Sequence, residues 1–136
     1  MDEKIAHLGF IQSVINRMGS NSFMIKGWCV ALVAAIFALS ADKENSAFAY
    51  LALFPLVIFW GLDTFFLRQE KMYRKLYEEV ANGNVKSEGF TMNSSVYSKD
   101  IGCYLDAAFS KTMLPFYGSM ILMIFIFMWK VLDLFK

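Results

Sequence analysis

An all-α integral membrane protein is the fold class that this sequence predicts, and three long apolar runs predict it. The runs cover residues 23–41, 46–62 and 112–129. Each has roughly the 17–20 residues that a helix needs to cross a bilayer. Hydrophobic residues make up 57% of the 136-residue chain, which is more than a soluble domain of this size can hide. We therefore expect three transmembrane helices, an N-terminal amphipathic helix and a cytosolic extension of the second span, assembled as a homo-oligomeric bundle.

Four consecutive segments follow from this interpretation. Residues 1–22 form a cytosolic amphipathic helix and linker, and residues 23–67 form a transmembrane hairpin of spans one and two. Residues 68–111 hold the helix extension, a loop and a helix before the last span, and residues 112–136 form the third transmembrane helix. Positive charge marks the cytoplasmic side of a membrane protein. A cytoplasmic N-terminus places 10 of the 13 basic residues inside and 3 outside, so the C-terminus is expected outside.

The N-terminal helix is predicted over residues 2–18 by apolar residues at helical spacing. Gly19 is expected to end it, and Ser20, Asn21 or Ser22 to cap the next helix. Its apolar stripe needs a partner, which is the membrane surface, the cytosolic helix after span two, or another subunit. The stripe consists of Ile5, Leu8, Ile11, Val14, Ile15 and Met18.

Small residues recur three or four positions apart along span one. Such a face lets helix backbones approach closely in lipid, where packing drives association. It is either a subunit interface or a contact with spans two and three of the same chain. The face consists of Gly27, Ala31, Ala34, Ala35 and Ala38.

The second span is predicted to continue as one helix over 47–81, until Asn82-Gly83 breaks it. Its cytosolic part carries an apolar and aromatic stripe that is the natural partner of the N-terminal helix. A polar loop follows over 82–99. Ser98 or Asp100 is then expected to cap a helix that begins near Ile101 and runs into span three, where Pro115 is compatible with a bend.

Asp63 directly follows the uncharged 17-residue run 46–62 and lies near the cytoplasmic end of span two. A carboxylate at that depth normally faces a partner or a water-filled space. Two interpretations stay open. Asp63 pairs with Lys26, Arg17 or Arg68, or it lines the vestibule or gate of a pore.

The residue types of catalysis and metal binding are sparse. His7 is the single histidine, and the two cysteines, Cys29 and Cys103, are expected to be reduced packing residues. No nucleophile–histidine set or glycine-rich phosphate loop is present. We therefore expect no enzyme, no cofactor and no metal. An ion path would have to form between subunits with apolar walls, which favours gating by dewetting.

Six runs of the chain carry a resemblance to a known group of proteins. The runs are 10–18, 21–28, 59–63, 67–70, Tyr73-Arg74-Lys75-Leu76-Tyr77 and Pro115-Phe116-Tyr117. They resemble small three-span membrane effectors of bacterial anti-phage defence, in particular the channel effector of the Hailong system. The resemblance covers most of the chain and is structural rather than chemical. It implies a homo-tetrameric channel whose opening depolarises the inner membrane. It also implies a partner nucleotidyltransferase whose short DNA oligomers bind the cytosolic part and hold the channel closed.

Basic and aromatic residues of the cytosolic helices are the candidate ligand-binding residues. Multiplied by symmetry, the cations would form a ring that holds phosphates, and the tyrosines would stack bases. The positive-inside signal explains the same charges without any ligand. His7 and Asn16 are weaker candidates. The set consists of Arg17, Arg68, Lys71, Arg74, Lys75, Tyr73 and Tyr77.

The leading hypothesis is an oligomeric, ligand-gated effector that permeabilises the bacterial inner membrane. Its partners would be further copies of the chain, the lipid bilayer and short DNA oligomers. A non-conducting membrane scaffold, or a subunit of a larger complex, is the first alternative. A holin-like lesion former is the second, although the charges predict the opposite orientation to that expected of three-span holins.

Overall fold

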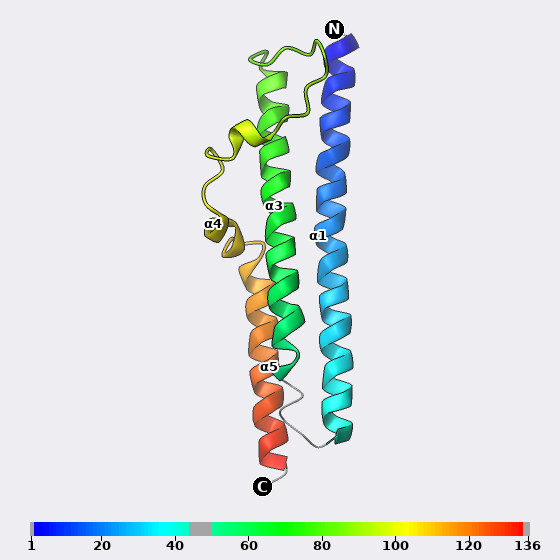
Figure 1. The fold of residues 1–136 in the computed structure, drawn as a ribbon, viewed down its shortest axis with the longest axis vertical. Helices are drawn as coiled ribbons and strands as arrows, with labels where there is room; N and C mark the ends of the chain where they lie inside the picture. Colours follow the sequence, from blue (N-terminus) through cyan, green and yellow to red (C-terminus); the bar gives the residue numbers. More distant parts are fainter. Residues whose placement is uncertain (1, 44–49, 135–136) are drawn as a thin grey trace. The chain divides into compact units, whose positions relative to one another are not determined.

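The computed structural model describes residues 2–43 and 50–134, and these residues form helices and turns with no β-strand. The all-α class is therefore confirmed. The predicted start of span two, at residues 46–49, lies outside the described residues. In order, the elements are α1 (Asp2–Lys43), α3 (Leu53–Ala81), the 3-10 helix η1 (Ser95–Tyr97), α4 (Tyr104–Ala108) and α5 (Leu114–Leu134) (Figure 1).

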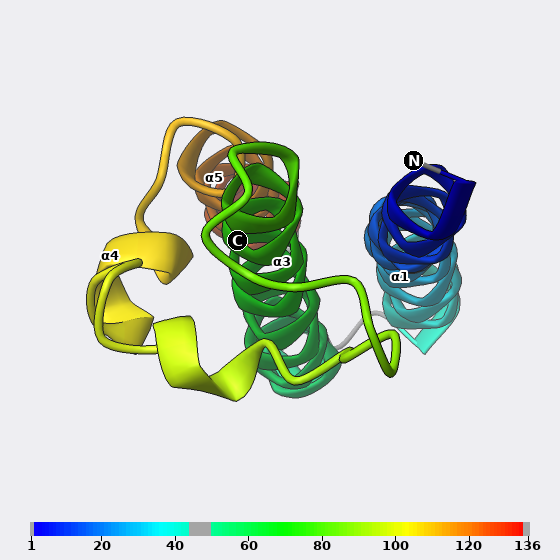
Figure 2. The ribbon, with the colours of Figure 1, turned by 90° about the horizontal axis from the view of Figure 1, so that it is seen from above.

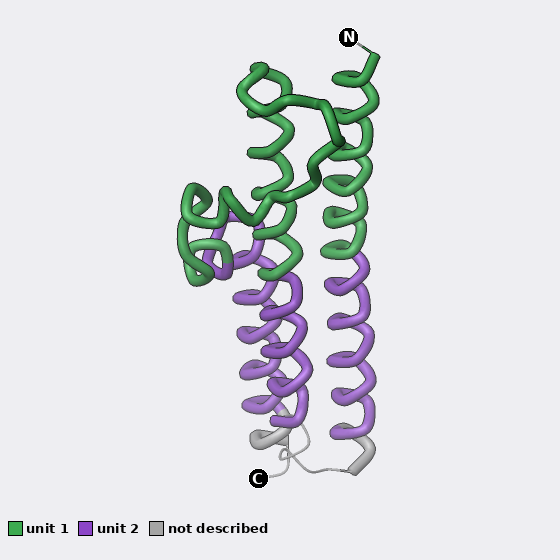
Figure 3. Tube along the Cα trace, turned by 45° about the horizontal axis from the view of Figure 1, so that its top comes forward, with its two compact units in different colours: residues 1–23, 64–107 green, residues 24–63, 108–136 purple. Residues whose placement is uncertain are grey.

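The chain divides into two compact units, and each has its own core. Unit 1 comprises residues 1–23 and 64–107, and unit 2 comprises residues 24–63 and 108–136 (Figure 3). Both units draw on α1 and α3. Each unit is therefore built from segments that lie far apart in the sequence.

The core of unit 1 is the contact between the first part of α1 and the last part of α3. Ile11 and Ile15 of α1 pack against Leu76 and Val80 of α3, and all four are buried. Their spacing of four residues puts each pair on one helix face. The predicted packing of the N-terminal helix against the last part of α3 is therefore confirmed.

A loop that we call the strap, residues 84–97, crosses from the end of α3 to α1 (Figure 2). His7 of α1 is fully buried beneath it. The His7 Nε2–H donates to the Thr91 carbonyl at 2.7 Å, and Nδ1 lies 3.3 Å from the Ser87 hydroxyl. The Phe90 ring stands edge-on to the rings of His7 and Phe10. His7 therefore anchors the strap from the α1 side.

The end of α3 lies where the sequence predicts it. Gly83 adopts a φ of +82°, a conformation that favours glycine, and its N–H donates to the Val80 carbonyl at 3.1 Å. The Asn84 N–H donates to the Glu79 carbonyl at 2.9 Å. These bonds satisfy carbonyls that the last turn of a helix leaves without partners.

The predicted helix break at Gly19 is wrong, because α1 runs without interruption through Gly19 and the polar residues after it. A glycine inside a helix costs about 0.5–1 kcal/mol relative to alanine. The helix has buried residues on either side of that point, Ile15 in unit 1 and Cys29 in unit 2. Burial of an isoleucine side chain such as Ile15 is worth about 1.5–3 kcal/mol, so packing outweighs the local signal.

The predicted helix from Ile101 into span three is also wrong. Gly102 has a φ of +83°, α4 begins at Tyr104, and turns at 109–113 separate it from α5. The side chain that accepts a backbone N–H at the start of α4 is that of Asp106, rather than the predicted Ser98 or Asp100. The Cys103 thiol and backbone N–H both donate to its carboxylate and hold the pKa of Asp106 below its usual range. Cys103 is exposed, so the packing role expected for it is wrong, whereas Cys29 is buried as expected.

Unit 2 is a contact of three apolar helix segments. Phe37 of α1 stacks on Phe127 of α5 with ring centroids 4.2 Å apart, and Leu56 of α3 and Ile124 of α5 are fully buried. Pro115 is the second residue of α5, where its missing N–H costs no helical bond. One described helix, α1 over Asp2–Ser40, has the length and composition to cross a membrane, and the apolar stretch of α5, Leu114–Lys130, is shorter.

Large apolar side chains cover the outward surfaces of α3 and α5 in unit 2. Phe54 and Val57 of α3 are 71% and 62% exposed, and Leu122 and Trp129 of α5 are 60% and 65% exposed. The small face of α1 is also outward. All five of its members, from Gly27 to Ala38, are exposed, so they do not pack against α3 or α5 of the same chain.

Replacing His7 by alanine should loosen the strap. The variant removes the bond to the Thr91 carbonyl and the contact with Ser87, so amides of residues 85–92 should exchange with solvent at least tenfold faster. We expect the free energy of unfolding to fall by about 1–3 kcal/mol. Hydrogen exchange with mass spectrometry in detergent measures the first effect. Asn16→Ala is the control, because Asn16 is exposed on the same helix and accepts a hydrogen bond from Gln12. Equal rates of amide exchange in the His7→Ala and Asn16→Ala variants would show that His7 does not anchor the strap.

Candidate functional site

Asp63 is the centre of a buried polar cluster in unit 2. Its side chain is fully buried, and the Lys26 ammonium lies 2.5 Å from its Oδ2. The Tyr117 hydroxyl donates to the same oxygen at 2.8 Å. Lys26 comes from α1, Asp63 from α3 and Tyr117 from α5. One carboxylate oxygen thus joins the three helices of the unit.

Aromatic and sulfur atoms surround the cluster. The Lys26 ammonium lies 5.9 Å from the centre of the Phe116 ring and 3.8 Å from the Met113 sulfur. The Trp60 ring stacks on Tyr117 with centroids 5.5 Å apart, and its N–H donates to the Ala108 carbonyl at 3.0 Å. The ring face attracts the cation, and the tryptophan holds the tyrosine in place.

Helical periodicity explains why these polar side chains point inward. Lys26 precedes the buried Cys29 and Val33 by three and seven residues, so all three share a face of α1. Tyr117 follows the buried Met113 by four residues, and Asp63 follows the buried Leu56 by seven. The polar residues occupy core positions of otherwise apolar helix faces.

A buried carboxylate is stable here because its charge has close partners. Taking an ion out of water costs several kcal/mol, and a nearby opposite charge with further hydrogen bonds offsets that cost. Asp63 has both, from Lys26 and Tyr117. Loss of one partner leaves the other buried charge uncompensated. Separating Lys26 or Tyr117 from Asp63 would therefore be costly.

The expected pairing of Asp63 is confirmed for Lys26, one of the three cations proposed. Arg68 instead donates to the carbonyls of Ser98 and Gly102, both at 3.4 Å, and lies over the Tyr104 ring. Arg17 is exposed on α1 in unit 1. The sequence analysis did not identify Tyr117 as a partner of Asp63. The available signal was its position in an apolar run, because a buried tyrosine hydroxyl needs a hydrogen-bond partner.

The other predicted ligand-binding cations of α3 differ in their partners. Arg74 forms an ion pair with Glu70 at 2.8 Å, and Lys75 lies 3.6 Å from Glu79 and 3.7 Å from Glu78. Lys71 is half-buried. Arg74 and Lys75 thus already neutralise carboxylates of their own helix, and a phosphate would have to compete with these carboxylates.

The two predicted stacking tyrosines pack against the core of unit 1. Tyr73 and Tyr77 both contact the cluster formed by α1 and α3, and each is partly buried. Residues two apart on a helix point about 200° apart, so Lys75 lies on a different side of α3 from both tyrosines. Arg17 lies two positions after the buried Ile15 and so faces away from the core. Within one chain, the predicted set does not converge on one site.

Comparison with protein families, with curated proteins and with solved structures finds no match to this chain.

Replacing Asp63 by asparagine should destabilise unit 2. Lys26 would keep its charge in a buried place without a counter-ion, at a cost of about 3 kcal/mol. The double variant Lys26→Met with Asp63→Leu removes both charges and should unfold within about 1 kcal/mol of the parent chain. Unfolding titrations in mixed micelles, followed by circular dichroism, measure both.

Glu78→Gln is the matched control, because its carboxylate is 60% exposed and its loss should change the free energy of unfolding by less than about 0.5 kcal/mol. Additive effects of the two single substitutions, Asp63→Asn and Lys26→Met, would show that the pair contributes no coupling energy.

Proposed function

We propose that the chain is an oligomeric, ligand-gated channel that depolarises the bacterial inner membrane in anti-phage defence. Three helices would span the bilayer, with the N-terminus in the cytoplasm and the C-terminus in the periplasm. The single observation that carries the channel proposal is the exposed small face of α1. It offers further copies a place to pack, and an ion path would then form between subunits.

The apolar surface of unit 2 supports the membrane part of the proposal. Soluble monomers seldom expose contiguous apolar patches above a few hundred Å². Here bulky side chains such as Phe54, Leu122 and Trp129 are more than half exposed. Phe23 of α1 is 81% exposed as well. A lipid environment would cover all of these side chains without a protein partner.

The contrast between the helices supports assembly through α1. The outward faces of α3 and α5 carry bulky side chains that suit lipid contact, whereas α1 presents the stripe from Gly27 to Ala38. A Cβ added at Gly27 would meet no atom within 4 Å, so the chain itself does not require glycine at that position. Close approach of another helix would explain the glycine and the alanines. The tetramer implied by the resemblance is one closed arrangement of such contacts.

The cluster of Lys26, Asp63 and Tyr117 is the proposed gate. It joins three helices through one oxygen, and the cost of separating these partners would favour the closed state of the channel. A helix displacement that separates Lys26 from Asp63 would expose two charges at the cytoplasmic side of the spans. Lys26 lies on the inner face of α1 and the small residues on its outer face, so such a displacement of α1 would also change the path between subunits, whose wetting opens a dewetting gate.

The ligand is proposed to be a nucleotide or a short DNA oligomer at the cytosolic face, made by a partner nucleotidyltransferase. This part of the proposal comes from the resemblance described above. The ring of Arg17, Arg68, Lys71, Arg74 and Lys75 would need several copies of the chain, because the seven predicted residues do not converge within one copy.

A non-conducting membrane scaffold is the second candidate. The observation that favours it is the pairing of Arg74 and Lys75 with glutamates of the same helix. Cations that are already neutralised suit a structural helix as well as a ligand-binding one. A scaffold would associate through the same α1 face and conduct nothing.

Cells that make this chain should lose membrane potential, reported by a voltage-sensitive dye, and a genomic neighbour that makes the ligand should suppress the loss. Asp63→Asn should increase the leak of purified protein in liposomes at least threefold, because the gate loses its ion pair. Glu78→Gln should leave the leak unchanged. An unchanged membrane potential under every condition, including phage challenge, would reject the channel and favour the scaffold.

Placing bulk on the small face of α1 should separate the subunits. Ala34→Leu should weaken self-association at least tenfold, because a larger side chain prevents close helix approach. Native mass spectrometry from detergent measures the distribution of oligomers. Val57→Phe adds comparable bulk to an exposed position of α3 and should leave the distribution unchanged. An unchanged distribution with Ala34→Leu would exclude the α1 face as the interface.

A further inference from the structure

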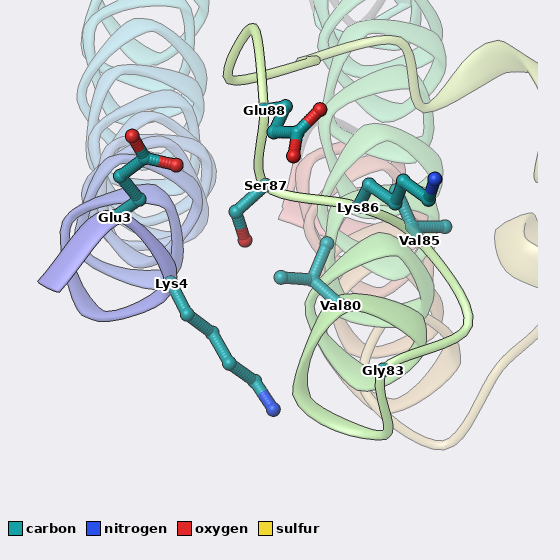
Figure 4. A pocket seen from close by; sticks show the side chains of 8 residues that line it. All are labelled: Glu3, Lys4, Val80, Gly83, Val85, Lys86, Ser87 and Glu88. Carbon is teal, nitrogen blue, oxygen red and sulfur yellow. The ribbon is translucent and has the colours of Figure 1, made fainter. Parts of the chain in front are cut away.

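A hollow of about 350 Å³ lies in unit 1, where the first turn of α1, the end of α3 and the beginning of the strap meet (Figure 4). It is open, and its charges cancel, because Lys4 and Lys86 stand beside Glu3 and Glu88. The Lys86 ammonium points away from Lys4 and from Ser87 in Figure 4. The hollow therefore lacks the converging polar groups of a built ligand site. Such convergence is found in unit 2, around a tryptophan.

Trp60 of α3 contacts both the buried polar cluster and the chain that leads into α5. Its ring lies parallel to that of Tyr117, with an interplanar angle of 4°. Its indole N–H donates to the Ala108 carbonyl at 3.0 Å, and the Phe109 ring stands edge-on to it with centroids 5.5 Å apart. One side chain therefore connects a member of the cluster with the last residue of α4 and the residue after it.

The segment 108–113 carries the chain from α4 into α5, and unit 2 resumes with its first residue (Figure 3). All of its residues except the first form turns. Its last residue, the buried Met113, places its sulfur 3.8 Å from the Lys26 ammonium. The Met113 carbonyl accepts the backbone N–H of Tyr117 at 3.1 Å. The segment therefore ends against both partners of the buried carboxylate.

The chain passes between the two units at three points, and a residue of this network lies beside each. Lys26 is the third residue of unit 2 on α1, Asp63 is its last residue on α3, and Ala108 begins its final stretch. At the first two points the chain is a continuous helix, which carries a displacement along its axis. The third point leads into turns, and loop residues absorb a displacement through changes in φ and ψ unless a side chain holds them. Trp60 holds the first residue of that segment.

We propose that Trp60 is a positioning residue, which transmits a displacement of the segment 108–113 to the Tyr117 hydroxyl and so to the Lys26–Asp63 pair. While the indole N–H holds the first carbonyl of the segment, the stacked Tyr117 ring keeps its hydroxyl on Asp63. A displacement of the segment carries the indole with it, and the tyrosine hydroxyl leaves the carboxylate. The inference deepens the proposed function by adding how the gate is released, and it rests on that function for the role of the cluster as a gate.

The reactivity of the Lys26 amine reports the state of the cluster without any need for conductance. Reductive methylation of the purified full chain in detergent, followed by peptide mass spectrometry, gives a rate for each lysine. The Lys26 side chain is 18% exposed and paired with Asp63, so it should react much more slowly than the exposed Lys99. Lys99 is the internal reference in every variant.

Two substitutions of Trp60 separate transmission from packing. Trp60→Phe keeps an aromatic ring but removes the N–H, and it should speed the methylation of Lys26 at least about threefold, the effect expected for one lost hydrogen bond. Trp60→His places an N–H at the ring position of the indole N–H and should stay within about twofold of the parent chain. A merely structural role would give the opposite order, because phenylalanine retains more apolar surface than histidine. Trp129→Phe, at a 65% exposed position of α5, is the matched control and should leave the rate unchanged.

A double-mutant cycle tests the route through Tyr117. Tyr117→Phe removes the hydroxyl and should itself speed the methylation of Lys26 at least about threefold. Adding Trp60→Phe should then raise the rate by less than about twofold, because both substitutions act on the same hydrogen bond. Independent effects would multiply, and that result would show that Trp60 does not act through Tyr117.

Several results would overturn the inference. One is an equal Lys26 rate in Trp60→Phe and the parent chain, and another is a Trp60→His variant that reacts as fast as Trp60→Phe. Circular dichroism checks the helix content. Where Trp60→Phe loses helix content, Trp60→His decides, because a rise of at least about threefold in a folded variant that keeps the donor contradicts the role of the N–H.

Liposome leak, measured separately, distinguishes this inference from the channel. The expected changes in Lys26 methylation without leak in any variant, Asp63→Asn included, would reject the channel and leave the transmission through Trp60 intact. Leak in Asp63→Asn together with unchanged methylation in Trp60→Phe would reject the transmission alone.

Discussion

The burial of one carboxylate constrains the whole of unit 2. Asp63 lies among apolar helix faces, where an unpartnered charge would cost several kcal/mol. Its two named partners come from the other two helices, Lys26 at 2.5 Å and Tyr117 at 2.8 Å. Apolar side chains can pack in several registers, whereas an ion pair and a hydrogen bond to one oxygen tolerate very few. The cluster therefore sets the register of α1, α3 and α5, which the surrounding apolar contacts then stabilise.

Unit 1 depends on a different kind of contact. Its helices meet through aliphatic side chains such as Ile11 and Leu76, and a histidine then fixes the loop that crosses them. The buried His7 has both ring nitrogens engaged on the strap. Phe90, next to that anchor, is the one non-glycine residue with positive φ among the described residues, at +49°. Its ring contacts with His7 and Phe10 compensate for that backbone conformation.

Local signals in the sequence predicted the elements well where no tertiary contact opposed them. Asn82-Gly83 ends α3 as expected, because glycine readily takes the positive φ of the cap. Gly19 was expected to end a helix and does not, because buried residues on both sides keep α1 helical. The Lys26–Asp63 pair was among the alternatives, since a buried charge requires a cation. The bond from Tyr117 to Asp63 was not, because a tyrosine in an apolar run signals that its hydroxyl needs a partner but does not show which helix supplies it.

The ion pair between Lys26 and Asp63 also increases the effective hydrophobic length of α1. The charge-free stretch of α1 from Gly27 to Ala41 is 15 residues, or about 22 Å of helix, which is shorter than the roughly 30 Å of a hydrocarbon core. Neutralised by Asp63, Lys26 no longer needs to reach the headgroups, and the apolar length extends back to Phe23, about 28 Å. In the proposed membrane arrangement, breaking the pair would create a hydrophobic mismatch of several Å. The helix would then have to shift, or the lipid around it would have to thin.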